Sequence, residues 1–181
     1  MKNFLTILFF TSFATSLFAQ NQWICKDGTT SFFSATAVED ISAKNKKVAS
    51  LLDISSKEIV VKMYINQFQF TNQLMEEHFN ENYLESDKFP TSVFQGKIQE
   101  DIDFKKVGEY PISAIGTLQM HGISKKTRIS GKVKVEKGKI TLDAKFDVLL
   151  PEFGIEVPSI VVAKVSEKMA VTNHFIYLPK P

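Results

Sequence analysis

The segment TRISGKVKVEKGKITLDAKFDVLL, Thr127 to Leu150, alternates apolar or small residues with polar ones on both sides of a central EKGK. One alternate set runs through both arms: Ile129, Gly131, Val133 and Val135, followed by Ile140, Leu142, Ala144, Phe146 and Val148. Successive side chains of a strand point to opposite faces of a sheet, so each arm has one face suited to a core. The segment therefore predicts an antiparallel hairpin that turns at EKGK.

The same alternation covers most of the chain on either side of this hairpin. In YPISAIGTLQMHG one face carries Tyr110, Ile112, Ala114, Gly116, Leu118, Met120 and Gly122. Further strands are expected over residues 29–35, 47–54, 57–70, 92–102 and 168–178. A slip of the apolar phase between Ile65 and Phe68 predicts a bulge. About eight strands with mostly short turns predict an all-β fold, an eight-stranded antiparallel barrel without exposed edges; a two-sheet sandwich is the alternative.

One segment departs from the strand pattern and is rich in carboxylates. It is EEHFNENYLESDKFP, residues 76–90. We expect a short helix from about Thr71 to Glu85, capped by Thr71 or Asn72 and stopped by Pro90. Steps of four residues place an apolar stripe beside a solvated acidic one. The apolar stripe is Met75, Phe79 and Tyr83, and the acidic stripe is Glu77, Glu81 and Glu85.

The first residues, MKNFLTILFFTSFATSLFAQ, combine a basic start, an apolar middle and a small residue at Ala19. This layout predicts a signal peptide over residues 1–19 and a single domain over residues 20–181. The apolar run is shorter than the roughly 20 residues that a membrane-spanning helix needs, so no stable membrane insertion is expected. Cys25 follows Trp23 and Ile24 rather than the small residue of a lipoprotein. A periplasmic or secreted protein without a lipid anchor is therefore expected.

Charge and cysteine content exclude some classes of partner. The chain has 22 basic and 20 acidic residues without a basic stripe, so no nucleic-acid partner is expected. The single cysteine, Cys25, rules out an internal disulfide. Its thiol is available to pair with a second chain in a homodimer, and a spare thiol is the alternative.

Catalytic and metal-binding motifs are not found in the sequence. His78, His121 and His174 belong to no HxH or HExxH pattern and are expected to be surface imidazoles. His78 with Glu77 and Glu81 is the remaining hypothesis for a metal site. No serine lies in a GxSxG elbow, and the glycines form no phosphate-binding loop. We therefore expect no catalytic residue, metal or cofactor, although carboxylate pairs that meet only in space are invisible in a sequence.

Several small residues occupy the inward phase of the predicted strands, among large neighbours. The small ones are Gly96, Ala114, Gly116, Gly131 and Ala144, and the large ones are Phe94, Leu118, Met120 and Phe146. Glycine within a strand marks a bend or a close approach of backbone or ligand. Two interpretations follow: the glycines permit strong coiling of the barrel, or they leave an apolar tunnel for a long, thin ligand.

Four segments together resemble the YceI-like family of exported lipid-binding proteins, over nearly all of the chain after the leader. They are TTSFFSATAVEDISAKN, FQFTNQLMEEHFNENYLESDKFPTSVFQGKI, GTLQMHGISKKTRISGKV and FDVLLPEFGIEVPSIV. Where the family usually has an FSIKH-like run, this chain has FFSATAVEDI, which resembles a variant found in Bacteroidota-type bacteria.

The resemblance implies a lipocalin-like eight-stranded barrel with a helix beside its mouth, holding a polyisoprenoid or isoprenoid-quinone chain along its axis. It favours the tunnel interpretation and a non-enzymatic lipid carrier or sequestering protein. The nine inward residues from Phe94 to Phe146 named above would then line the ligand site, with Met75, Phe79 and Tyr83 on the mouth helix. Two alternatives stay open: a filled barrel with a stress-response or scaffolding role, and an enzyme built on the same barrel.

Overall fold

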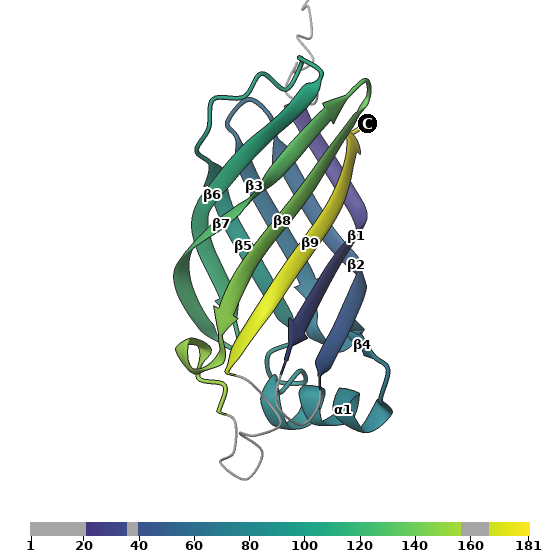
Figure 1. Cartoon of the computed structure of the whole chain (residues 1–181), viewed down its shortest axis with the longest axis vertical. Coiled ribbons are helices and arrows are strands. Elements are labelled where there is room, and N and C mark those ends of the chain that lie inside the picture. The colour runs from purple at the N-terminus through teal and green to yellow at the C-terminus, as the bar shows by residue number, and fades with distance from the viewer. Residues whose placement is uncertain (1–20, 36–39, 157–166) are drawn as a thin grey trace, which may run out of the picture.

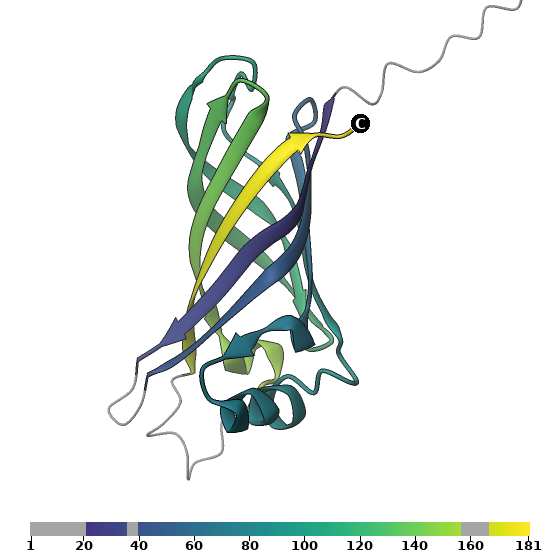
Figure 2. The same cartoon turned by 90° about the vertical axis from the view of Figure 1, so that its right-hand side faces the viewer.

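The computed structural model describes residues 21–35, 40–156 and 167–181, and these form one closed antiparallel barrel (Figures 1 and 2). Neighbouring strands follow the order β1-β9-β8-β7-β6-β5-β3-β2, and a β1–β2 pairing closes the ring. The strands are β1 (Gln22–Ser34), β2 (Ile41–Asp53), β3 (Glu58–Tyr64), β5 (Thr91–Ile98), β6 (Gly108–Met120), β7 (Ile123–Glu136), β8 (Lys139–Leu149) and β9 (Lys168–Pro179). The predicted eight-stranded barrel is confirmed. The predicted signal peptide lies outside the described residues.

The β7–β8 hairpin turns at the predicted position. Glu136 pairs with Lys139, so Lys137 and Gly138 form a two-residue turn. Gly138 has a φ of 75°, a left-handed conformation that glycine adopts without steric strain. The buried residues of both arms all belong to the predicted inward set, with Val133 and Ile140 fully buried, whereas Gly131, Ala144 and Phe146 are partly exposed. Local alternation and turn chemistry thus agree, which fixes the register of the hairpin.

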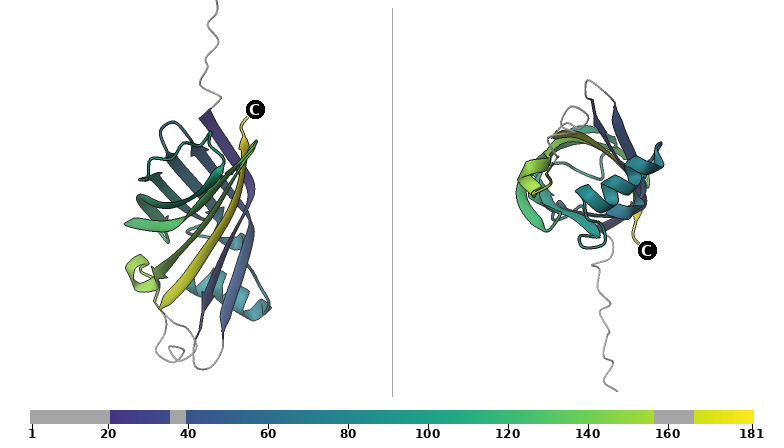
Figure 3. Two further views of the ribbon diagram at one scale, coloured as in Figure 1. Left: turned by 45° about the horizontal axis from the view of Figure 1, so that its top comes forward. Right: turned by 90° about the horizontal axis from the view of Figure 1, so that it is seen from below.

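The predicted helix is present, although it is shorter and ends differently. The helix α1 (Gln73–His78) continues into η3 (Phe79–Tyr83), one π-helical turn. Of the two expected caps, Asn72 is the one used, because its side chain accepts a hydrogen bond from the backbone nitrogen of Leu74 at 2.9 Å. The helix lies across one end of the barrel, seen from below in Figure 3. We call this the helix end, and the opposite end, where β1 begins and β9 ends, the far end.

The bulge predicted between Ile65 and Phe68 is wrong. The strand stops at Tyr64, a 3-10 turn η2 (Ile65–Gln67) follows, and β4 (Gln69–Phe70) then pairs with β2. The backbone nitrogen of Ile65 donates to the carbonyl of Pro90 at 2.9 Å, which anchors the turn. The turn points both Ile65 and Phe68 inward, where they are 3% and 5% exposed. The slip of the apolar phase in the sequence is therefore caused by a turn between two strands, and not by a β-bulge within one strand.

Buried side chains occupy the interior of the far half of the barrel. Tyr177, Leu52 and Ile140 are fully buried there. The Tyr177 hydroxyl lies 2.6 Å from Ser50 Oγ, which donates in turn to the carbonyl oxygen of Val60 at 2.9 Å. Burial raises the pKa of Tyr177, so the phenol remains a neutral hydrogen-bonding group.

The only cysteine of the sequence, Cys25, also points into the packed half, with 3% of its surface exposed. Burial raises the pKa of its thiol, which keeps the group protonated and unreactive. A disulfide to a second chain would require the thiol at the surface. The spare-thiol interpretation is therefore favoured over the disulfide-linked homodimer.

No helix among the described residues is both long and apolar enough to cross a bilayer.

Candidate ligand cavity

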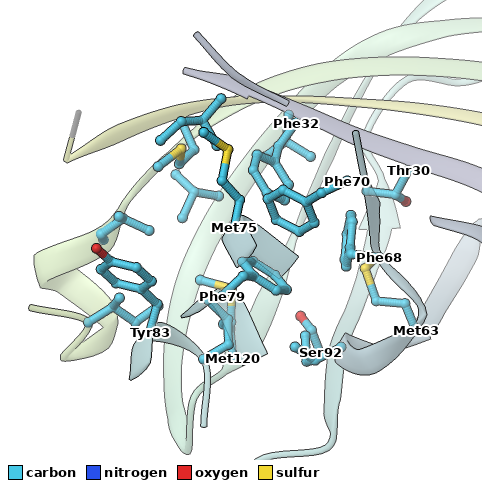
Figure 4. Close-up of a pocket in the computed structure, with 18 of the residues that line it drawn as sticks. Thr30, Phe32, Met63, Phe68, Phe70, Met75, Phe79, Tyr83, Ser92 and Met120 are labelled. Atoms are coloured by element: carbon cyan, nitrogen blue, oxygen red, sulfur yellow. The ribbon is translucent and has the colours of Figure 1, made fainter. Parts of the chain in front are cut away.

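The helix end of the barrel is hollow. A cavity of about 370 Å³ lies between the ends of the strands and α1, within the range typical of small-molecule sites (Figure 4). Its lining is mainly phenylalanine, methionine and aliphatic side chains from β1, β3, β4, β6, β8, β9 and the helix. They include Phe32, Met63, Phe68, Phe70, Met120, Phe146, Val148, Met169 and Val171. Methionine and phenylalanine offer a polarisable apolar surface that adapts to irregular ligands.

Phenylalanine rings attach the helix to the barrel. Phe79 of η3 stacks on Phe32 of β1 with ring centroids 5.5 Å apart, and it contacts Phe70 of β4 at 5.1 Å. Phe68 completes the group at 5.4 Å from Phe32. Met75, Phe79 and Tyr83 all face the cavity, as their spacing predicts (Figure 4). The short α1 is therefore held in place by the same side chains that line the cavity.

The polar side chains at the inner end of the cavity bond to the protein itself. Thr30 Oγ1 donates to Asn173 Oδ1 at 2.7 Å. Ser92 Oγ donates to the backbone carbonyl of Gln119 at 2.9 Å. Polar groups that are already paired do not demand a polar ligand beside them. The inner part of the cavity is therefore suited to hydrocarbon.

The residues predicted to line the ligand site divide into two groups. Leu118, Met120 and Phe146 belong to the cavity lining. Phe94, Gly96, Ala114, Gly116, Gly131 and Ala144, on β5, β6, β7 and β8, lie outside the lining. Direct contact of any of them with a ligand stays a prediction. The alternation of apolar and polar residues identified the inward face of each strand. It did not identify the level along the barrel axis at which the cavity begins.

The tunnel interpretation of the inward glycines is wrong. A Cβ atom on Gly116 would overlap the carbonyl oxygen of Gln95 and the Cα of Gly96 on the neighbouring strand. A Cβ on Gly131 would overlap the carbonyl oxygen of Asp143. These positions have no free space, because adjacent backbones approach closely there. The glycines serve the close approach and coiling of the strands, which was the other interpretation.

His121 is not the surface imidazole that was expected. It lies in the turn after β6 with a φ of 50°, and 11% of its side chain is exposed. Nε2 is 2.8 Å from Glu85 Oε2 and Nδ1 is 3.0 Å from the carbonyl oxygen of Phe153. Both partners are acceptors, so both bonds form together only when both ring nitrogens carry a proton. The HG pair at a strand end is a turn signal that alternation overlooked.

The His121 bonds join three segments at the helix end: the chain after η3, the β6–β7 turn, and η4 (Leu150–Phe153). The ring also meets Phe89 edge to face, with centroids 4.5 Å apart. The hydrogen bond from His121 lowers the pKa of the Glu85 carboxyl, with Lys88 adding to the effect. Glu85 has a φ of 43° and lies beyond the helix, so it does not belong to the acidic stripe predicted with Glu77 and Glu81.

The other two histidines are exposed, as predicted. His174 Nδ1 donates a hydrogen bond to the carboxylate of Asp143 at 2.7 Å on the outer face. His78 lies on α1 at the rim of the cavity. Over the described parts of the chain, no cluster of three or more His, Cys, Asp or Glu side chains is arranged to hold a metal ion, the His78 group included.

Fold and cavity together define a small antiparallel barrel with an apolar cavity at the end where α1 lies. Residues 23–176 match the model of the YceI-like domain, and the chain belongs to this family. A comparison with curated proteins gave no match.

Solved structures show the same fold at low sequence identity. A polyisoprenoid binding domain from Saccharophagus degradans, implicated in plant cell wall breakdown, is 11% identical with a TM-score of 0.73, covering 88% of this chain and 99% of its own. BcnA from Burkholderia cenocepacia is 11% identical with a TM-score of 0.70, over 82% and 95% of the two chains. A YceI protein from Campylobacter jejuni is 17% identical with a TM-score of 0.66, over 100% of both.

Proposed function

We propose that this protein is an exported, non-enzymatic carrier or store for an isoprenoid-type lipid, whose apolar chain occupies the cavity at the helix end. The observation that carries the proposal is the cavity itself: about 370 Å³ of space, lined mainly by apolar side chains, at the helix end of the barrel. The structural match to a domain described as polyisoprenoid binding supports the choice of lipid class.

Burial of hydrocarbon supplies the affinity in this proposal. Each methylene moved from water into an apolar site gains about 0.8 kcal/mol, so a chain needs no charged anchor. The aromatic and methionine side chains of the lining suit a branched, unsaturated chain. Carriage, storage and sequestration are served by the same cavity, and no group in it is required to react.

Native mass spectrometry of the protein purified from its own cells tests this function. We expect a discrete added mass that organic extraction releases as an intact isoprenoid lipid. Val171→Phe places a ring in the cavity and is expected to reduce the added mass, whereas Thr172→Phe places the same ring on the outer face and serves as the control. Wild-type protein without added mass, which also fails to take up isoprenoids in vitro, would support the filled-barrel alternative. Recovery of a chemically altered lipid would support an enzyme.

Export is part of the same proposal and rests on the sequence of residues 1–19. The mature protein is expected to start at Gln20 and to be recovered from the periplasm or the medium. Mass analysis of its N-terminus is the test. An intact Met1, or a diacylated Cys25, would contradict it. The FFSATAVEDI segment adds the expectation of a Bacteroidota-type source.

A further inference from the structure

The lining of the cavity stops part-way along β1, β3, β5, β6, β8 and β9. On each of these strands the inward residues alternate, so the last residue of the lining and the next inward residue are two positions apart. These pairs are Thr30 and Gly28 on β1, Met63 and Val61 on β3, Ser92 and Phe94 on β5, Leu118 and Gly116 on β6, Phe146 and Ala144 on β8, and Asn173 and Phe175 on β9. We call the second member of each pair the floor layer.

Two buried phenylalanine rings lie inside the barrel in the floor layer. Phe175 is 1% exposed, and its ring occupies the space that a side chain on Gly28 would take. Phe94 is 6% exposed, and its Cζ lies 2.7 Å from the position of a Cβ on Gly96. The small residues of this region therefore make room for rings from neighbouring positions. The rings close the cavity where a continuous tunnel would have to pass.

The described interior behind the floor layer is occupied by buried side chains. Leu52, Ile98, Ile140 and Tyr177 are at most 1% exposed there. The open side of the cavity is at α1, where Leu74 belongs to the lining and is also 56% exposed. A chain can therefore enter beside α1 and must stop at the rings of Phe94 and Phe175.

The size of the cavity sets the length of chain that it holds. An apolar cavity of about 150 Å³ takes one benzene, which is about 25 Å³ for each carbon. The 370 Å³ cavity then holds about 15 carbons, or three isoprene units. We infer that the floor layer limits this site to about three isoprene units of any ligand. The inference rests on the proposed function of the same cavity and adds its chain-length specificity.

Isoprenols of increasing length test the limit. Lipid-free protein is titrated with all-trans isoprenols of 10, 15, 20 and 30 carbons, delivered from cyclodextrin, with displacement of a fluorescent fatty acid as the readout. Each buried methylene gains about 0.8 kcal/mol, which tightens binding about fourfold, so five added carbons in the cavity are expected to lower Kd at least tenfold between the 10- and 15-carbon chains. Beyond 15 carbons it is expected to change less than threefold, because the added units stay outside.

Two variants change the depth of the cavity in opposite directions. Phe94→Ala removes one ring and is expected to let the 20-carbon isoprenol bind at least tenfold tighter than the 15-carbon one. Leu118→Phe adds volume at the inner end of the lining and is expected to remove the advantage of 15 carbons over 10. The second variant keeps the test decisive if Phe94→Ala does not fold.

The outcomes separate the inference from the function on which it rests. Affinity that keeps rising through 20 and 30 carbons in the wild type would overturn the length limit and leave the lipid-binding function intact. A 15-carbon preference that neither variant alters would also overturn the role of the floor layer. Failure of every isoprenol to bind would overturn the proposed function itself.

Discussion

The two halves of this barrel are built from the same strands and differ in what fills them. In the far half, the side chains of Tyr177, Phe175 and Leu52 occupy the interior with almost no exposed surface. In the helix half, equally large side chains such as Phe32 and Phe146 surround an empty space. Large residues thus occur both around the cavity and in the packed half, and the inward glycines lie where the interior is full. The size of inward side chains therefore does not reveal where a barrel is hollow.

The difference has a physical origin in the glycines and in α1. In the far half and the floor layer, glycines allow rings and neighbouring backbones to approach closely, as Gly28 does for Phe175 and Gly116 for β5. At the other end, α1 lies across the opening and covers the interior without filling it (Figure 3). Close packing gives the far half its stability, and the covered space gives the helix half its capacity to bind.

The largest expected loss of stability comes from a substitution in the floor layer. Gly116→Leu drives a side chain into the backbone of β5 and is expected to lower the free energy of unfolding by about 3 kcal/mol or more. The loss should be the same with and without a bound isoprenoid, measured by denaturant unfolding. Met120→Leu, on the same strand but in the cavity lining, is the matched control and should change stability by less than about 1.5 kcal/mol.

The opposite result for Gly116→Leu would reinstate a tunnel. A variant as stable as the wild type without lipid, but with a smaller lipid-dependent gain in melting temperature, would mean that the new side chain occupies ligand space.

A smaller effect is expected from the buried hydroxyl pair of the far half. Ser50→Ala leaves the Tyr177 hydroxyl buried without its partner and is expected to cost about 1–3 kcal/mol. Tyr177→Phe added to Ser50→Ala should recover part of that loss, because the double variant no longer buries a tyrosine hydroxyl without its partner. Thermal unfolding of the single and double variants measures the difference. A double variant less stable than Ser50→Ala would contradict this account of the pair.

The smallest effect concerns the acid dependence of the helix end. The bond from His121 lowers the folded-state pKa of Glu85, so the stabilisation is present above the ordinary carboxyl pKa of about 4.3 and is lost as the pH falls through the lowered value. The stability difference between wild type and Glu85→Gln should therefore shrink as the pH is lowered from 6 to 3. Glu77→Gln, on the exposed face of α1, should stay within about 0.5 kcal/mol of the wild type. A pH-independent difference for Glu85→Gln would contradict the bond.

Much of the fold follows from local patterns that need no structure. Alternation identified the inward faces of β6, β7 and β8, and the glycine in EKGK identified their hairpin turn. Spacing identified Met75, Phe79 and Tyr83 as the inner face of the helix segment. These features depend only on residues a few positions apart in the chain, so the local sequence pattern is enough to predict them.

The cavity could not be predicted in the same way, since it depends on levels along the barrel. From the sequence, Gly116 is expected to leave space inside the barrel. The structure pairs it with Gly96, whose backbone occupies that space. His121 appears exposed until Glu85 and the Phe153 carbonyl, 36 and 32 positions away, are brought to its ring. Phe94 and Phe175 limit the cavity because their rings occupy the space beside Gly96 and Gly28, where any other residue would have a side chain. Relations of this kind arise from strand register and closure, which periodicity does not specify.

The most direct test of the contrast between the halves is a crystal of lipid-free protein pressurised with xenon, which enters empty apolar cavities. Xenon is expected in the helix half, in contact with lining side chains such as Phe32, Met120 and Val148, and not beyond Phe94 and Phe175. Xenon sites that continue past the floor layer toward Tyr177, or none beside α1, would contradict the account.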